Sequence, residues 1–128
     1  MATTVTSTID LRTSLRTKLL TKCTTVYYLR AKDGGTTPYI VFSLNEANYN
    51  ETYVQYDFEV HVVGFGTDTT DIENLTDSVW DLFNHYSECA NGLSYTVYPV
   101  VRNNLTDENT NTIHRRILFT VKSFIGGY

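Results

Sequence analysis

The sequence predicts an α+β fold, in which a mixed, mainly antiparallel sheet of about five strands carries two helices on one face. Two segments repeat apolar residues at the spacing of a helix, and others alternate apolar and polar residues as half-buried strands do. These segments follow each other in the order α-β-β-β-α-β-β. The 128 residues contain no internal repeat, linker or low-complexity block, so residues 1–128 are expected to form a single domain.

The first expected helix extends from Thr8 to Leu20. Leu11, Leu15 and Leu19 recur every four residues, which places them in one stripe along a helix. Basic residues occupy other positions around the same helix. The leucine stripe is therefore expected to pack against the sheet.

A β-hairpin is expected between residues 26 and 42. Segments 26–29 and 39–42 are rich in β-branched and aromatic residues, which favour strands. The sequence Lys-Asp-Gly-Gly at 32–35 lies between them and is typical of a turn. Two strands joined in this way would run antiparallel.

The longest expected strand extends from Tyr53 to Phe65. Apolar residues at 56, 58, 60 and 62 alternate with polar residues at 55, 57, 59 and 61. Such alternation is typical of a strand with one buried face, and it favours antiparallel neighbours.

A second helix is expected to begin at Thr70, because Thr70 and Glu73 have the spacing of a capping box. Its apolar stripe continues to Tyr86, and the sequence Asn-Gly at 91–92 is a suitable end. Two more strands are expected at 93–102 and 113–124. The segment 103–112 between them is too polar for the core and is predicted to be a loop.

The chain carries a formal net charge of −4 and has a pI near 5.2. Broad binding to nucleic-acid phosphates needs clustered Lys and Arg, and the only basic cluster is at 114–116. Nucleic-acid binding is therefore not expected. The sequence has neither a signal-peptide pattern nor the roughly 20 consecutive apolar residues of a membrane span, so synthesis in the cytoplasm is expected.

No catalytic or metal-binding motif stands out. His85 and Cys89 have ligand spacing, but a zinc site needs three or four protein ligands, so no metal is expected. Cys23 and Cys89 fit no metal or redox pattern and are expected to be reduced thiols. The sequence lacks nucleophile, phosphate-loop and dinucleotide signatures, so we expect no enzyme and no cofactor. A small enzyme with a site assembled from distant residues remains an alternative.

Five segments in order along most of the chain carry a family resemblance. They are the N-terminal helix, VYYLRAKDGGTTPYIVFSL, the alternating YVQYDFEVHVVGFG, the capped TDIENLTDSVWDLFNHY and the closing HRRILFTVKSF. Together they resemble the tail terminator or tail-completion proteins of long-tailed bacteriophages. The resemblance implies an α+β subunit that closes into a ring, commonly sixfold, ends growth of the tail tube and joins the tail to the neck. It implies no catalytic residues.

The resemblance also implies the partners of the protein. These are further copies of the chain, the tail tube protein and a neck or connector protein, while DNA passes through the lumen without specific binding. Such a protein would be located in the virion and would contact no membrane. The Thr and Asn content and the long polar segment before Ile113 differ from common family members. Another connector or neck subunit and a monomeric protein-binding module therefore remain alternatives.

Ten residues are candidates for subunit contacts or for the lining of a ring lumen. They are Gln55, Asp57, Glu59, His61, Asn48, Tyr49, Asp107, Glu108, Arg115 and Arg116. The first four form the polar face of the long strand, and the next four belong to the polar segments expected as loops at 45–52 and 103–112. An acidic strand face would repel DNA in a lumen, whereas at a subunit seam it would meet the two arginines of a neighbour. The many tyrosines fit an interface, although they are equally good strand formers.

Overall fold

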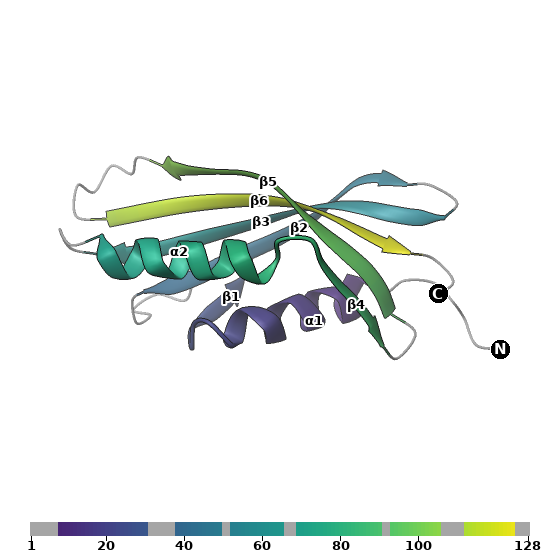
Figure 1. Cartoon of the computed structure of the whole chain (residues 1–128), viewed down its shortest axis with the longest axis horizontal. Helices are drawn as coiled ribbons and strands as arrows, with labels where there is room; N and C mark the ends of the chain where they lie inside the picture. Colours follow the sequence, from purple (N-terminus) through teal and green to yellow (C-terminus); the bar gives the residue numbers. More distant parts are fainter. Residues whose placement is uncertain are drawn as a thin grey trace.

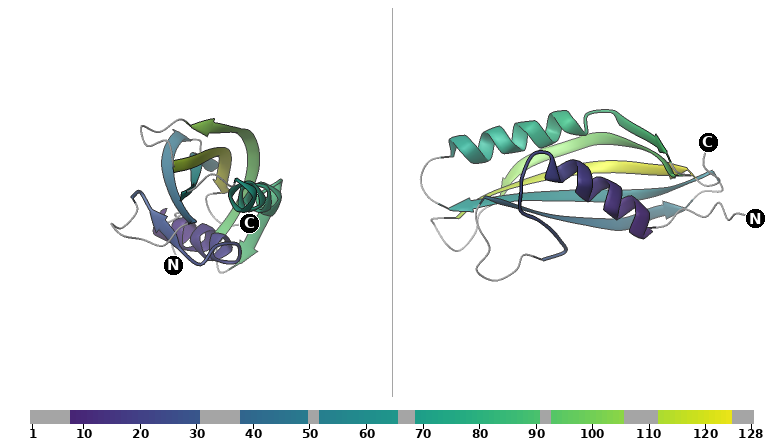
Figure 2. Two further views of the ribbon diagram at one scale, coloured as in Figure 1. Left: turned by 90° about the vertical axis from the view of Figure 1, so that its left-hand side faces the viewer. Right: turned by 90° about the horizontal axis from the view of Figure 1, so that it is seen from below.

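The computed structural model describes residues 8–30, 38–49, 52–65, 69–90, 93–105 and 112–124. In this part of the chain, six strands form one curled sheet with two helices on the same side of it (Figures 1 and 2). The elements are α1 (Thr8–Leu20), β1 (Val26–Tyr28), β2 (Tyr39–Tyr49), β3 (Tyr53–Phe65), α2 (Thr70–Leu82), β4 (Tyr86–Ala90), β5 (Leu93–Leu105) and β6 (Thr112–Phe124). The predicted α+β class is confirmed, with one strand more than expected.

The strands lie in the order β1-β2-β3-β6-β5-β4, so β3 and β6 form the centre of the sheet. These two strands pair antiparallel over their whole length, from Tyr53 opposite Phe124 to Phe65 opposite Thr112. All other pairs are also antiparallel except β1 with β2. Register shifts occur in β2 near Asn48 and in β5 near Val100.

The predicted hairpin at residues 26–42 is wrong, because β1 runs parallel to β2. Val26 lies opposite Ile40, and Tyr28 lies opposite Phe42. Leu29 then adopts a left-handed backbone conformation with φ 73°, which turns the chain out of the sheet after three strand residues. The connection between two parallel strands must run back along the length of the first strand. Because β1 has only three residues, this distance is short. The glycine-rich turn signal itself lies outside the described residues.

The core lies between the two helices and one face of the sheet. The stripe of Leu11, Leu15 and Leu19 is fully buried, as predicted. On β3 and β6, alternate residues are buried, which also confirms the predicted strand faces. Phe58 lies at the centre, with its ring stacked on Phe119 at 5.5 Å between centroids.

Gly64 shows how closely α2 approaches the sheet. A Cβ atom at this position would lie 2.3 Å from Cδ1 of Ile72 on α2, which is shorter than any normal contact. The absence of a side chain at the end of β3 therefore allows the first turn of α2 to pack on the sheet.

The second helix begins at Thr70, as predicted, but its cap residue and its end differ from the prediction. Its N-cap is Thr69, whose side chain makes no capping hydrogen bond, and Thr70 is already helical. With Thr69 as the N-cap, Glu73 is one position beyond the capping-box position, and its carboxylate contacts Arg115 on β6. The helix ends at Leu82, since the chain turns at His85 with φ 56°.

Residues 86–90 form the edge strand β4 rather than the last turn of a helix. This strand pairs with β5, from Tyr86 opposite Val97 to Ala90 opposite Leu93. His85 and Cys89 therefore do not share a helix, and the helical ligand spacing inferred from the sequence is wrong.

The two predicted loops are shorter than expected. Residues 45–49 continue β2, and residues 103–105 continue β5, so each is paired in the sheet. Asp107 and Glu108 lie outside the described residues. Neither described helix has the length and apolar character needed to span a membrane.

Candidate interface on the open face of the sheet

The sheet has one face that neither helix covers, which we call the open face. Four of the predicted site residues, Gln55, Asp57, Glu59 and His61, lie on its central strand β3 and are half-buried. Their neighbours in the strand point to the opposite face, into the core. The alternation in the sequence thus placed these four side chains correctly on one surface.

A chain of four polar side chains crosses from β3 to β6 on the open face. His61 Nδ1 lies 2.7 Å from His114 Nε2, and His61 Nε2 lies 2.7 Å from Glu59 Oε1. Arg116 Nε donates to the same Glu59 oxygen at 2.7 Å. About a quarter of each of the His61, Glu59 and Arg116 side chains is exposed. We call these four residues the histidine cluster.

The surroundings set the charge of two members of the histidine cluster. The hydrogen bond from Arg116 lowers the pKa of Glu59 below its ordinary value of 4.5, against the opposing effect of burial. Burial lowers the pKa of His61 below its ordinary value of 6.5, although the Glu59 carboxylate acts in the opposite direction. Near neutral pH, Glu59 is therefore a carboxylate and His61 a neutral imidazole.

These charge states determine where the protons lie. A carboxylate can only accept, so His61 Nε2 must donate to Glu59, and the Nδ1 atom of the neutral ring must accept. His114 Nε2 is then the donor to His61 Nδ1. The cluster is thus a directed series of hydrogen bonds, fixed at the Glu59 end by the Arg116 guanidinium.

The remainder of the open face is balanced in charge rather than acidic. Lys122 on β6 lies over the rings of Tyr53 and Tyr98, with Nζ at 5.0 and 5.8 Å from the centroids. Asp57 lies between Asn45 and Thr120 in the strand register, with no opposite charge directly across. Among the described residues, Arg116 and Lys122 therefore offset Glu59 and Asp57, so this part of the face is not the bare acidic surface expected from β3 alone.

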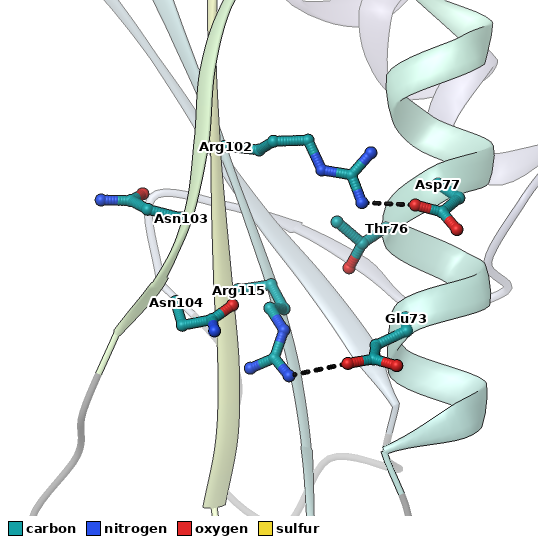
Figure 3. A pocket seen from close by; sticks show the side chains of 7 residues that line it. All are labelled: Glu73, Thr76, Asp77, Arg102, Asn103, Asn104 and Arg115. Atoms are coloured by element: carbon teal, nitrogen blue, oxygen red, sulfur yellow. Dashed lines mark hydrogen bonds and ion pairs between the residues drawn. The ribbon is translucent and has the colours of Figure 1, made fainter.

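Arg115 and Arg116 point to opposite sides of β6. Whereas Arg116 belongs to the histidine cluster, Arg115 contacts Glu73 of α2 with 3.3 Å between Nη2 and Oε1 (Figure 3). A second arginine, Arg102 of β5, contacts Asp77 one turn further along α2. The four side chains border a polar pocket of about 310 Å³ between α2 and the sheet. Their charges are paired across it, so the pocket offers no unbalanced charge for a ligand.

The other predicted site residues are dispersed. Asn48 is an exposed residue of β2 opposite Gln55, and Tyr49 is the last residue of β2. Cys89 is exposed on the edge strand β4. Within the described ranges, no group of three or more His, Cys, Asp or Glu side chains is arranged to hold a metal ion. His114 was missed as a partner of His61, because only the pairing of β3 with β6 brings them together.

Neither a family model nor a curated protein matches the chain. Solved structures do match, and one of them is a chain from the virion of a native gene transfer agent particle, with a TM-score of 0.67. This chain shares its fold with a virion protein. The match has 11% sequence identity and covers 86% of this chain and 91% of the other. A second solved chain, whose description names no function, matches with a TM-score of 0.68, 16% identity, and coverage of 92% and 96%.

Proposed function

We propose that this protein is a structural, non-enzymatic subunit of a phage-like virion. In this role it forms a ring at the head-proximal end of the tail tube, ends tube growth and joins the tail to the neck. The observation that carries the proposal is the fold shared with a chain of the gene transfer agent virion, over nearly the full length of both chains. The resemblance of the sequence segments to tail terminator proteins supplies the position in the tail.

The shape of the described sheet supports a ring. A ring closes by head-to-tail contacts, so each subunit must offer two different surfaces that fit each other. The two edges of the sheet are different, with the three-residue β1 at one and the five-residue β4 at the other. The open face is a further surface, which no helix or strand of the described residues covers, and its balanced charges suit contact with protein.

The proposal can be tested with the purified protein and the tail tube protein of the same particle. We expect native mass spectrometry to find a closed oligomer, alone or after the tube protein is added, and electron microscopy to show it at one end of the tubes. Tubes grown in its presence should stop at a uniform length. A protein that stays monomeric and leaves tube length unchanged would contradict the proposal and favour a monomeric binding module.

The test also separates a tail terminator from another neck subunit. A neck or connector subunit would form a ring without binding the tube end or limiting its growth. Binding to the tube end is therefore the decisive result, whereas ring formation alone is common to both roles.

A further inference from the structure

We propose that His61 and His114 form a proton-operated clamp between β3 and β6. The clamp stays closed while a single proton lies between the two facing nitrogens, and it opens when protons occupy both. The proposal rests on the geometry of the histidine cluster and does not depend on the proposed function.

The distance between the two rings requires a shared proton. Nδ1 of His61 and Nε2 of His114 are 2.7 Å apart, which is a hydrogen-bonded separation and is too short for two facing N–H groups. The ring centroids are 4.9 Å apart, and the planes are tilted by 58°. The rings therefore meet through these nitrogen atoms rather than by stacking face to face.

Counting protons shows when the contact must break. Two neutral rings hold one proton between the facing nitrogens. If the pair gains one more proton, either imidazolium can still donate to the other, neutral ring, so the contact persists as a charge-assisted hydrogen bond. Only the next proton gives two facing N–H groups on two positive rings, and the two rings must then move apart. The contact therefore depends on how many protons the two facing nitrogens hold in total.

The neighbours in the cluster determine the pH range. Burial lowers the pKa of His61 below its ordinary value of 6.5, and the charges of His114 and Arg116 act in the same direction. Glu59 opposes them, and it stays ionised because its own pKa is lowered from 4.5. His61 therefore takes up its second ring proton at a pH below 6.5, while the Glu59 carboxylate still accepts from its Nε2.

Few other titratable groups of the described residues face the pair. In the register, Val41 of β2 is opposite His61, and Leu105 of β5 is opposite His114. Further along the same face are Tyr39 on β2 and Asp57 on β3, beyond Glu59 and Arg116. Histidine is therefore the group in this neighbourhood that changes charge in mild acid.

The sign of the effect on stability follows from the lowered pKa of His61. Such a group stabilises the folded protein fully above its unfolded pKa near 6.5, and this stabilisation is lost as the pH falls through the folded pKa. If the open face is a seam or lumen surface, opening of the clamp would also change the assembly in acid. That consequence alone rests on the proposed function.

The first experiment determines the proton positions by ¹⁵N NMR of the histidine rings in the full chain. At pH 7.5 we expect His61 and His114 both to carry hydrogen on Nε2, and the hydrogen bond between them to persist until His61 takes up a second ring proton at a pH below 6.5. A His61 ring protonated on Nδ1 at neutral pH, or a His61 ring that takes up its second proton at or above pH 6.5, would overturn the proposal. This result does not depend on any ring or tail.

The second experiment compares unfolding between pH 7.5 and pH 5 for the wild type, His114→Gln and the matched control His85→Gln. Gln can place an amide nitrogen or oxygen at the Nε2 position, so it keeps the hydrogen bond with either form of His61 but does not titrate. Between these two pH values, the equilibrium constant for folding of the wild type should fall about tenfold for each unit by which the pKa of His61 in the folded protein lies below its unfolded value. His85→Gln should behave in the same way, because His85 lies outside the cluster. His114→Gln should lose less, and an equal loss in all three proteins would contradict the clamp.

Discussion

Phe83 and Trp80 both contact the core from α2 and its C-terminal end, but they differ in how completely their rings are enclosed. Phe83 is fully buried and meets Phe58 at 5.2 Å and Phe119 at 5.5 Å between centroids. Trp80 is only partly buried, with Phe119 at 5.9 Å on one side and the guanidinium of Arg102 at 5.5 Å. In the sequence, Phe83 belongs to the apolar stripe of the second helix and Trp80 lies beside that stripe, but period alone does not show how completely each ring is enclosed.

We therefore expect Phe83→Ala to cost about 3 to 5 kcal/mol in the free energy of unfolding, the usual range for a buried aromatic ring. Trp80→Ala should cost less, because part of its ring is already in contact with water. Chemical denaturation of both variants would measure the difference. If Trp80→Ala is as unstable as Phe83→Ala, the tryptophan contributes more to the stability of the core than its exposure indicates.

The histidine cluster marks the limit of prediction at the level of residues. Alternation in β3 was enough to place Glu59 and His61 on one surface, since side chains two apart in a strand share a face. Their contacts with His114 and Arg116 depend on the register between strands that are far apart in sequence. No local pattern determines that register, so the sequence alone could not place His114 and Arg116 beside Glu59 and His61 of the same chain.

At the level of elements, the sequence was accurate where a long periodic segment determines the structure. The leucine stripe of α1 and the alternation in β3 and β6 extend over several turns or residue pairs, and each was confirmed. The errors lie in short elements. The parallel pairing of β1 and the edge strand β4 depend on left-handed residues, Leu29 and His85, which are not glycine and gave no turn signal.

The extension of β2 into the predicted loop can be tested by hydrogen exchange. Asn45 and Glu46 lie opposite Asp57 and Tyr56, so this part of β2 is paired with β3 in the isolated subunit. In an antiparallel edge, only alternate amides point toward the neighbouring strand. We expect alternate amides at 45–48 to exchange slowly in the free protein, measured by NMR. Uniformly fast exchange there would favour the mobile loop that the sequence indicated.

At the level of the whole molecule, the open face is the surface whose role decides between a lumen and a subunit seam. The seam first expected from the sequence needed Arg115 or Arg116 of a neighbour to meet Asp57 and Glu59. In the structure, Arg116 contacts Glu59 of the same chain, and Arg115 contacts Glu73 on the other side of β6. Asp57 is therefore the better probe, because reversing the charge of Glu59 would also disrupt the histidine cluster.

Asp57→Lys should separate the two roles, with Asp81→Lys as the matched control on the exposed side of α2. If Asp57 lines a seam, the substitution should weaken ring assembly, and added salt should change the size of the effect because salt screens exposed charges. If Asp57 lines a lumen, the ring should form normally and DNA should pass more slowly, since a lysine attracts phosphate. Native mass spectrometry of the rings and the rate of DNA release from assembled particles would measure these outcomes. Asp81→Lys should change neither, and a normal result for Asp57→Lys in both assays would leave the open face without a role in the assembly.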